Sequence, residues 1–319
     1  MTHFRFAQTM NSRNLLLVAL VMILTLSLGC NKSQPTSNGP ETFASPDNAG
    51  QAIYAAAKTG DGNALITIFG SAAKELIISG DPVQDKAGFD LFTSRYDEMH
   101  RWRKFANGGL VLDIGAENYP FPFALLKDSS GLWYFDTNSA KEEILARRIG
   151  GNELATVDTL NAMADAQTEY FGQTHDGSHV RQYAQKFISD EGKRNGLYWK
   201  PADENQPESP LGPLAAYASA EGYSGNMQAP QPFRGYFYRL LTKQGEAAHG
   251  GAKDYIVNGA MTGGFAILAY PAEYGNSGVM SLLINQDGVV FEKNLGENTT
   301  DAVKAITAFN PDGTWKPVE

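Results

Sequence analysis

The densest group of side chains able to do chemistry is the segment His175-Asp176-Gly177-Ser178-His179. Two histidines four residues apart, together with an aspartate, can hold a metal ion when they share one face of a helix. Gly177 and Ser178 instead predict a loop, in which that spacing fixes no ligand geometry. The segment also lacks the alternating acidic residues of a calcium-binding loop. We therefore interpret it as a solvated turn, with a metal site as the alternative, and we expect no metal ion and no cofactor.

A second set of residues, Ser209, His249 and Asp254, has the side-chain types of a serine-histidine-aspartate triad. The three residues are far apart in the sequence, and no local motif links them. The sequence also contains no HExxH zinc motif, no GxSxG nucleophile elbow, no P-loop and no GxGxxG after a strand. We therefore assign no catalytic residue, and whether the protein is an enzyme stays open, with a non-catalytic role favoured.

Cys30 is the only cysteine in the chain, so neither an internal disulfide nor a cysteine-based zinc site can form. It closes a leading segment that contains Arg5 and Arg13, no acidic residue, and an almost unbroken apolar run from Leu15 to Leu28. The fourteen residues of this run would rise only about 21 Å as a helix, which is short of the roughly 30 Å hydrocarbon core of a bilayer. The pattern is typical of a secretory signal peptide rather than a permanent span.

The end of this segment, Leu28-Gly29-Cys30, resembles a bacterial lipobox, in which the cysteine is acylated and becomes the mature N-terminus. Gly29 matches the small residue of that motif, whereas Ser27 stands where Leu, Val or Ile is usual. The alternatives are an ordinary secretory signal with an incidental cysteine, or an uncleaved anchor. The resemblance predicts a lipoprotein signal peptide over residues 1–29 and lipidation of Cys30, with palmitate as one acyl chain and the membrane as a partner.

The residues after Cys30 indicate where the mature chain is held. Lipoprotein sorting in Gram-negative bacteria usually retains an aspartate after the cysteine at the inner membrane, so Asn31 implies an outer-membrane lipoprotein facing the periplasm if the host has that envelope. Residues 30–42 are rich in Ser, Pro, Asn and Gly, which is typical of a flexible tether. We therefore expect an exported protein of the cell envelope.

The composition is that of a soluble globular protein of one or two domains, with 319 residues, of which 42% are hydrophobic and 19% charged. The formal charge of -9 becomes -11 once Arg5 and Arg13 leave with the signal peptide. Nucleic-acid binding needs concentrated Lys and Arg, and an anionic lipid surface would repel an acidic body. We therefore exclude nucleic acid as the main partner and expect, besides the lipid, an envelope protein or polymer of unknown kind.

Residues 43–150 are expected to form an N-terminal α+β domain. Residues 45–47, Ser-Pro-Asp, are a helix start, and aromatic residues at steps of three and four predict a longer helix over 86–105. Strands are expected over residues 110–114, 122–126 and 132–136, with a hairpin turn at 128–131. Helices followed by an antiparallel meander resemble the cone-shaped fold of the nuclear-transport-factor-2-like superfamily, which includes both enzymes and binding modules.

Residues 151–319 are expected to form a C-terminal α+β domain. A long helix over 139–171 is predicted to start with a capping box of Ser139 and Glu142, and Gly150-Gly151 is predicted to interrupt it. Strands are expected near residues 236–241, 255–257, 265–270, 279–284 and 289–293, with a last helix over 300–309. A long helix packed on an antiparallel sheet is similar to the globular head of type IV pilins and pseudopilins. Their continuous apolar N-terminal helix is missing here, so this resemblance implies a fold and not polymerisation.

Several short stretches, taken together, look like the bacterial domain-of-unknown-function family numbered 2950. These stretches are Phe43–Pro46, Ile78–Pro82, Tyr119–Pro122, Arg148–Leu154, Gly196–Trp199, Pro210–Leu214, Gly263–Phe265 and Pro271–Gly275. They span nearly the whole chain after the tether. The resemblance implies an exported bacterial protein of unassigned activity, and it supplies no catalytic residue.

The function that the sequence favours is a non-catalytic structural, assembly or binding module carried on a lipid anchor. The alternative is a hydrolase of envelope polymers whose residues come together only in the fold. A cleft at the domain junction lined by His175, Asp176 and a carboxyl group of shifted pKa would favour the hydrolase, whereas a solid junction would favour the binding module. Aromatic residues near the C-terminus, such as Tyr198-Trp199, suit a glycan or peptide groove, but we favour the core of a small sheet.

Overall fold

The computed structural model describes residues 39–105, 108–201, 208–223 and 231–318, all within one compact unit, Ser37–Glu319. The predicted signal peptide over 1–29, Cys30 and most of the tether over 30–42 lie outside the described residues. Within the described ranges, no helix is both long enough and apolar enough to cross a membrane.

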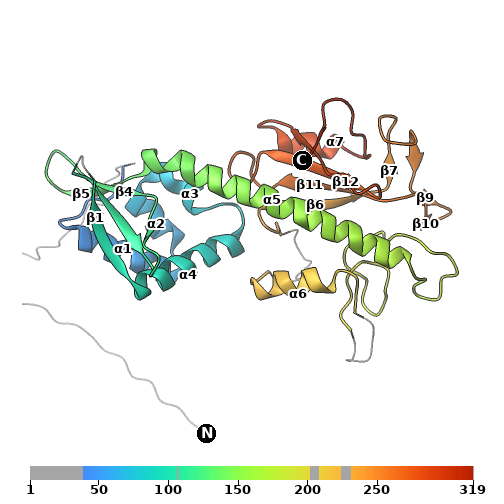
Figure 1. The fold of residues 1–319 in the computed structure, drawn as a ribbon, viewed down its shortest axis with the longest axis horizontal. Helices are drawn as coiled ribbons and strands as arrows, with labels where there is room; N and C mark the ends of the chain where they lie inside the picture. The colour runs from blue at the N-terminus through green and yellow to red at the C-terminus, as the bar shows by residue number, and fades with distance from the viewer. Residues whose placement is uncertain (1–38, 106–107, 202–207, 224–230, 319) are drawn as a thin grey trace, which may run out of the picture. The chain divides into compact units, whose positions relative to one another are not determined.

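The N-terminal part begins with helices that start at capping residues (Figure 1). These are α1 (Pro46–Thr59), α2 (Gly62–Phe69), the short 3-10 helix η1 (Ser71–Ala73), α3 (Lys74–Ile77) and α4 (Pro82–Glu98). As predicted, Ser45 caps α1, because its Oγ accepts a hydrogen bond from the N–H of Asn48 at 3.2 Å. Asp81 caps α4 in the same way, and the proline that follows it occupies the first helical position.

An antiparallel sheet follows these helices, as predicted. Its strands are β1 (His100–Lys104), β2 (Leu110–Ile114), β3 (Tyr119–Pro120), β4 (Ala124–Lys127) and β5 (Trp133–Asp136). They pair in the order β1-β2-β4-β5, with β3 on β2. The helix predicted over 86–105 is wrong at both ends, since α4 begins at Pro82 and ends at Glu98. Residues 100–104 form a strand because they pair with β2, from His100 opposite Ile114 to Lys104 opposite Leu110, and a helical period cannot reveal that tertiary pairing.

A first hydrophobic cluster lies between the N-terminal helices and this sheet. Phe69 of α2 is at its centre, with ring centroids 4.2 Å from Phe123 and 5.0 Å from Phe135. Burying aromatic side chains of this size is worth about 1.5–3 kcal/mol each. Helix α4 takes little part, because Tyr96 is its only buried residue.

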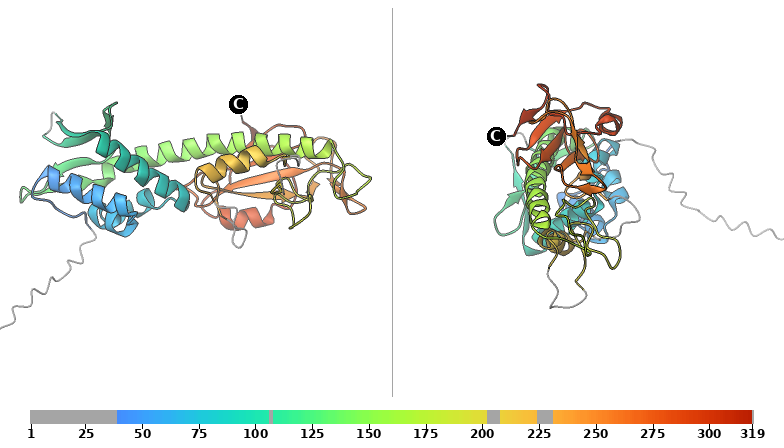
Figure 2. Two further views of the ribbon diagram at one scale, coloured as in Figure 1. Left: turned by 90° about the horizontal axis from the view of Figure 1, so that it is seen from below. Right: turned by 90° about the vertical axis from the view of Figure 1, so that its right-hand side faces the viewer.

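One long helix, α5 (Thr137–Phe171), connects the two parts of the fold (Figures 1 and 2). It continues through Gly150-Gly151, so the predicted interruption is wrong: each glycine costs about 1 kcal/mol relative to alanine, and hydrophobic contacts on both sides outweigh that cost. The predicted capping box is also wrong, since the Oγ of Ser139 donates to the carbonyl of Asp136 (3.3 Å) from within the first turn. The boundary between 150 and 151 stays a prediction.

The C-terminal part is a second antiparallel sheet packed on α5. Its strands are β6 (Tyr236–Leu241), β11 (Ala266–Pro271), β12 (Met280–Asn285), β13 (Phe291–Asn294) and β14 (Lys316–Pro317), in the order β14-β13-β12-β11-β6. Two short ribbons accompany it, β7 (Lys243–Gln244) with β8 (Lys253–Asp254), and β9 (Ile256–Val257) with β10 (Ala260–Met261). Helix α6 (Gly212–Ala220) was not predicted, and α7 (Thr299–Ala305) is shorter than predicted.

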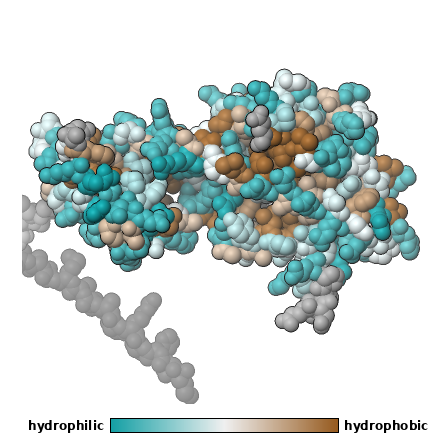
Figure 3. Space-filling model, in the orientation of Figure 1, coloured by the Kyte–Doolittle hydropathy of each residue, from teal (hydrophilic) through white to brown (hydrophobic). Residues whose placement is uncertain are grey.

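A second hydrophobic cluster fills the space between α5 and this sheet. Leu160 of α5 and Ile267 of β11 are 0% exposed there. On the face drawn in Figure 3, hydrophobic residues gather over the C-terminal sheet, while the N-terminal part is mostly hydrophilic. Helices followed by a meander, and then a long helix on an antiparallel sheet, confirm the predicted α+β class.

Candidate functional site

A buried carboxylate, Asp81, joins the start of α4 to the C-terminal part of the fold. The side chain is 0% exposed, and its Oδ1 accepts from the backbone N–H groups of Val83 and Gln84 at 3.1 and 3.2 Å. Its Oδ2 accepts from the hydroxyl of Tyr223 (2.7 Å) and from the N–H of Gly235 (3.0 Å). Burial, and then the bond to Asp81, hold the pKa of Tyr223 well above that of an ordinary tyrosine. One carboxylate therefore caps a helix and ties it to two distant segments.

Arg148 makes a second connection from α5. Its guanidinium donates to the carbonyls of Glu75 (2.7 Å) and Leu76 (2.5 Å) near α3, and to the Oδ1 of Asn276 (2.5 Å) in the loop before β12. Burial lowers the pKa of Arg148, and the nearby carboxylates of Asp85 and Glu273 act in the opposite direction. Backbone carbonyls and nearby carboxylates together stabilise the positive charge of Arg148, and a partly buried guanidinium needs such partners.

Asn152, one turn further along α5, connects α4 to the loop before β12. Its Oδ1 accepts from the Nε2 of Gln84 (2.7 Å), and its Nδ2 donates to the carbonyl of Ser277 (2.9 Å). Gly235 lies beside it with a positive φ of 75°, and a Cβ at that position would lie 2.5 Å from the Asn152 amide nitrogen. Only glycine combines this conformation with this close approach.

We call the set Asp81, Arg148, Asn152, Tyr223, Gly235 and Asn276 the polar junction. Three of the stretches on which the family resemblance rests, Ile78–Pro82, Arg148–Leu154 and Pro271–Gly275, meet in or beside it. Each polar side chain of the polar junction has at least one hydrogen-bond partner. The arrangement is suited to holding segments together, since it presents no free nucleophile.

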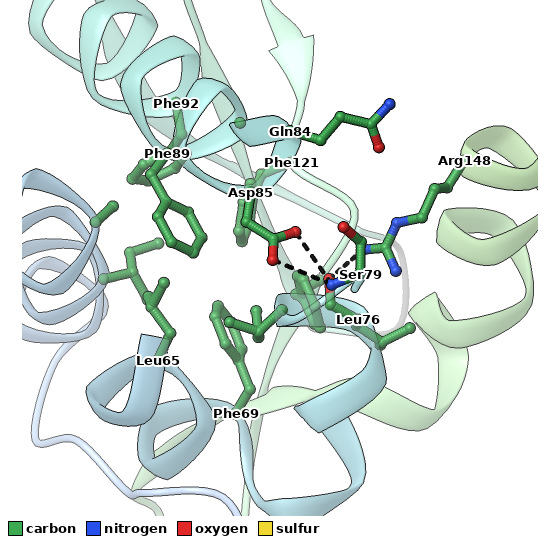
Figure 4. Close-up of a pocket in the computed structure, with 15 residues that line it drawn as sticks. Leu65, Phe69, Leu76, Ser79, Gln84, Asp85, Phe89, Phe92, Phe121 and Arg148 are labelled. Carbon is green, nitrogen blue, oxygen red and sulfur yellow. Dashed lines mark hydrogen bonds between the residues drawn. The ribbon is translucent and has the colours of Figure 1, made fainter. Parts of the chain in front are cut away.

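An apolar cavity of about 340 Å³ lies next to the polar junction, under α4 (Figure 4). Its walls come from α1, α2, α3, α4 and the chain around β3 and β4, and are mainly aliphatic and aromatic. The apolar lining residues are Ile53, Ala57, Leu65, Phe69, Leu76, Ile77, Phe89, Phe92, Phe121 and Phe123. A neighbouring hollow of about 490 Å³ shares four lining residues with it, namely Ala57, Ile77, Asp85 and Phe89.

The polar groups of the apolar cavity gather at one end, where Ser79, Gln84, Asp85 and Arg148 line it. Figure 4 shows the Asp85 carboxylate pointing from α4 toward Ser79, with Phe89 and Phe69 around it. Both carboxylate oxygens accept from the Ser79 backbone N–H, at 3.1 and 3.2 Å. Burial raises the pKa of Asp85, while its hydrogen bonds with Ser79 and the charge of Arg148 partly offset this. An apolar pocket with a few polar groups at one end can bind a small molecule.

The predicted cluster around His175 lies elsewhere, after the C-terminal end of α5. The His175 ring stacks on Tyr170 with centroids 3.8 Å apart, and its Nε2 is 2.9 Å from the Tyr170 carbonyl. The Asp176 carboxylate accepts from the N–H of Arg194 (3.0 and 2.9 Å), while His179 is exposed. This is the turn that the sequence favoured over a metal site. Across the described ranges, no three His, Cys, Asp or Glu residues are grouped to hold a metal ion.

The other residues considered for chemistry are not brought together. His249 and Asp254 are exposed, whereas Ser209 is buried and its Oγ has no hydrogen-bond partner among the described residues. Trp199 belongs to the second hydrophobic cluster and Tyr198 packs against it, in line with the favoured core interpretation. Cys30, the predicted lipidation site, lies outside the described residues.

Fold and site together define an α+β protein with two hydrophobic clusters, a buried polar junction and an apolar cavity. The chain belongs to the family of proteins of unknown function DUF2950, whose model matches residues 40–318. This confirms the family predicted from the sequence. Comparison with curated proteins and with solved structures gave no match. The likeness to pilin heads and to the cone-shaped superfamily therefore stays a prediction.

Neither the apolar cavity nor Asp85 was predicted from the sequence. Phe89 and Phe92 are among the aromatic residues whose spacing predicted the helix over 86–105. In the structure they are only partly buried and line the apolar cavity. The available signal was Asp85 itself, an acidic residue one turn before those aromatic residues on the same helical face.

Proposed function

We propose that this protein is a lipid-anchored protein of the bacterial cell envelope whose folded part is a non-catalytic module that binds a small ligand in the apolar cavity. The lipobox-like end at Cys30 supports the anchor, and the tether over 30–42 supports a body held away from the bilayer. In a Gram-negative host, Asn31 would direct it to the outer membrane, facing the periplasm. Its partners would be the membrane, through the lipid, and an envelope protein or polymer.

The observation that carries the binding role is the apolar cavity. Protein interiors are close-packed, and empty apolar space costs stability because the lining atoms lose dispersion contacts. A volume of about 340 Å³ lies within the range of small-molecule sites. The hydrogen bonds of the polar junction beside it hold the surrounding segments together, which would help such a site to keep its shape.

Binding can be tested with the chain from residue 31 onward, which contains the whole compact unit. The probe is N-phenyl-1-naphthylamine, an uncharged fluorophore that brightens in apolar surroundings. Gly88 lines the apolar cavity and a Cβ there meets no atom within 4 Å, so Gly88→Phe should fill the space and weaken binding at least about tenfold. Gly151→Phe is the matched control, because Gly151 is also helical, exposed and free of neighbours within 4 Å. Equal binding by both variants would contradict a site in the cavity.

Anchoring is tested separately in bacteria expressing the full chain. Radiolabelled palmitate should enter the protein and the label should be lost in Cys30→Ala, because no other cysteine is present. Incorporation that survives this substitution would overturn the lipid anchor and leave the binding role untouched.

A hydrolase acting on envelope polymers is the second candidate. Asp85 favours it, since a carboxyl group with a raised pKa in a pocket is a common general acid. His175 and Asp176, the residues first considered for that role, instead hold a turn at the far end of α5. Hydrolysis of purified peptidoglycan that disappears in Asp85→Asn would favour the enzyme over the binding module.

A further inference from the structure

Among the described residues, Asp85 is the only acidic one that lines the apolar cavity. Ser79 is the only described residue that donates hydrogen bonds to it: its N–H is shared by both oxygens, and its side chain also lowers the pKa of Asp85. A carboxylate has about four acceptor sites, so part of this capacity is free. Among the described residues, none forms an ion pair with Asp85 within 4.0 Å.

Several of the donors around Asp85 already have other partners. Three of the five N–H groups of Arg148 donate to the carbonyls of Glu75 and Leu76 and to Asn276. The amide of Gln84 donates one of its two N–H groups to Asn152 at 2.7 Å. The end of the cavity therefore presents to a ligand a carboxylate whose neighbouring donors are partly bonded elsewhere.

The nearest lysines are also engaged elsewhere. Lys86, the next residue on α4, pairs with Asp90 at 2.5 Å on the exposed side of the helix. Lys58, on the wall of the neighbouring hollow, donates to the hydroxyl of Tyr54 at 2.8 Å. Neither of them neutralises Asp85.

We propose that the apolar cavity takes an amphipathic amine, with its apolar body among the aromatic side chains and its ammonium group at the Asp85 carboxylate. This inference rests on the proposed binding function and names its ligand class. An ammonium group brings three donors to an acceptor that has one protein residue as partner. Phe89, on the same wall, adds an aromatic ring that can contact a cation.

The two competing ligand classes fit less well. A fatty acid or another anion would place like charge beside Asp85 and find three of the five N–H groups of Arg148 already bonded. A neutral apolar ligand would fill the cavity but remove water from a carboxylate without replacing the lost hydrogen bonds, which is costly. Burial, and to a smaller extent the charge of Asp81, raise the pKa of Asp85 more than Ser79 and Arg148 lower it, as expected for a carboxyl group without an ion-pair partner.

The test compares three probes with one apolar chain and different heads: n-octylamine, n-octanol and n-octanoate. Calorimetric titration of the chain from residue 31 onward at about pH 7 should show octylamine binding at least about tenfold more tightly than octanol, with octanoate weakest. In Asp85→Asn, which keeps the shape and an acceptor oxygen, the preference for the amine should disappear while octanol still binds. Gly88→Phe should reduce the binding of all three.

The outcomes separate this inference from the function on which it rests. Equal binding of octylamine and octanol, tighter binding of octanoate, or an amine preference that survives Asp85→Asn would overturn the amine while the apolar cavity remains a binding site. Failure of all three probes to bind, or binding that Gly88→Phe does not change, would overturn both. A circular dichroism spectrum and a melting curve for each variant show that the fold is retained.

Discussion

The two hydrophobic clusters of this fold are packed to different degrees. Between α5 and the C-terminal sheet, β11 and β12 each bury five of their six residues. In the N-terminal cluster, α4 buries one residue of seventeen, and a cavity of about 340 Å³ remains under it. The strands of one core are thus densely buried, whereas the other core leaves a cavity beside a charged group, and such empty apolar space lowers stability. The N-terminal cluster is where we propose that a ligand binds, and the C-terminal cluster would then be the scaffold.

The largest difference should appear when one side chain is removed from each cluster. Leu268 of β11 is 0% exposed in the C-terminal cluster, so Leu268→Ala should lower the free energy of unfolding by about 3–5 kcal/mol. Phe89 is only partly buried beside the apolar cavity, so Phe89→Ala should cost about 1 kcal/mol, although more atoms are removed. Urea denaturation followed by tryptophan fluorescence measures both. Similar losses in the two variants would mean that the N-terminal cluster is packed as tightly as the C-terminal one.

The polar junction should be the next most sensitive region. Asp81→Ala removes a helix cap and leaves the Tyr223 hydroxyl and the Gly235 N–H without their buried acceptor, so we expect a loss of about 3 kcal/mol. Asp61→Ala is the control, since Asp61 caps α2 by a single bond to Ala64 at an exposed site. It should cost about 1 kcal/mol. Equal losses would show that the bonds of Asp81 to the C-terminal part contribute nothing to stability.

The helices and strands that could be predicted from the sequence are those determined by neighbouring residues in the chain. Ser45 marks the start of α1, and strand β2 was placed at its observed bounds, residues 110–114, because capping and β-branched runs act over a few residues. The strand at 100–104 and the continuity of α5 through Gly150-Gly151 were missed. Both depend on partners distant in the sequence, namely β2 and the two hydrophobic clusters.

The candidate site was predictable only in part. The stretches that carry the family resemblance include Asp81, Arg148 and Asn152, yet their meeting in the polar junction depends on bonds that link α4, α5 and the loops before β6 and β12. The apolar cavity could not be predicted because it is formed by residues from several helices and strands that meet only in the folded chain. Asp85 could not be distinguished from a solvated helix charge until its burial was known.

Asp85→Asn should stabilise the protein near neutral pH. Burial raises the pKa of this carboxyl group in the folded state, so the folded state binds the proton more tightly than the unfolded chain. Its contribution to stability then falls as pH rises from the unfolded pKa through the raised folded pKa, and the penalty is complete above that window. The charged groups facing Asp85 are Arg148 on α5 and Asp81 before α4, which act in opposite directions.

The measurement is the melting temperature of both proteins between about pH 4 and pH 8. Asp85→Asn should melt roughly 2 °C higher than the parent at the neutral end, and the two curves should converge toward the acidic end. Asp90→Asn is the control on the same helix, because Asp90 is exposed and paired with Lys86, and exposed ion pairs contribute little. A lower melting temperature for Asp85→Asn at neutral pH would mean that the charged carboxylate is stabilised by its surroundings.

The smallest expected effect is on stability and ligand affinity when either of two helical glycines is replaced by alanine. Gly88→Ala in α4 and Gly151→Ala in α5 each place a methyl group where no atom lies within 4 Å, and each should gain about 0.5–1 kcal/mol from helix propensity. Only the methyl group at Gly88 enters the lining of the apolar cavity. Both variants should therefore be more stable than the parent, while only Gly88→Ala changes the affinity for N-phenyl-1-naphthylamine. If Gly151→Ala changed that affinity equally, the effect would come from the stiffness of helices and not from the space under α4.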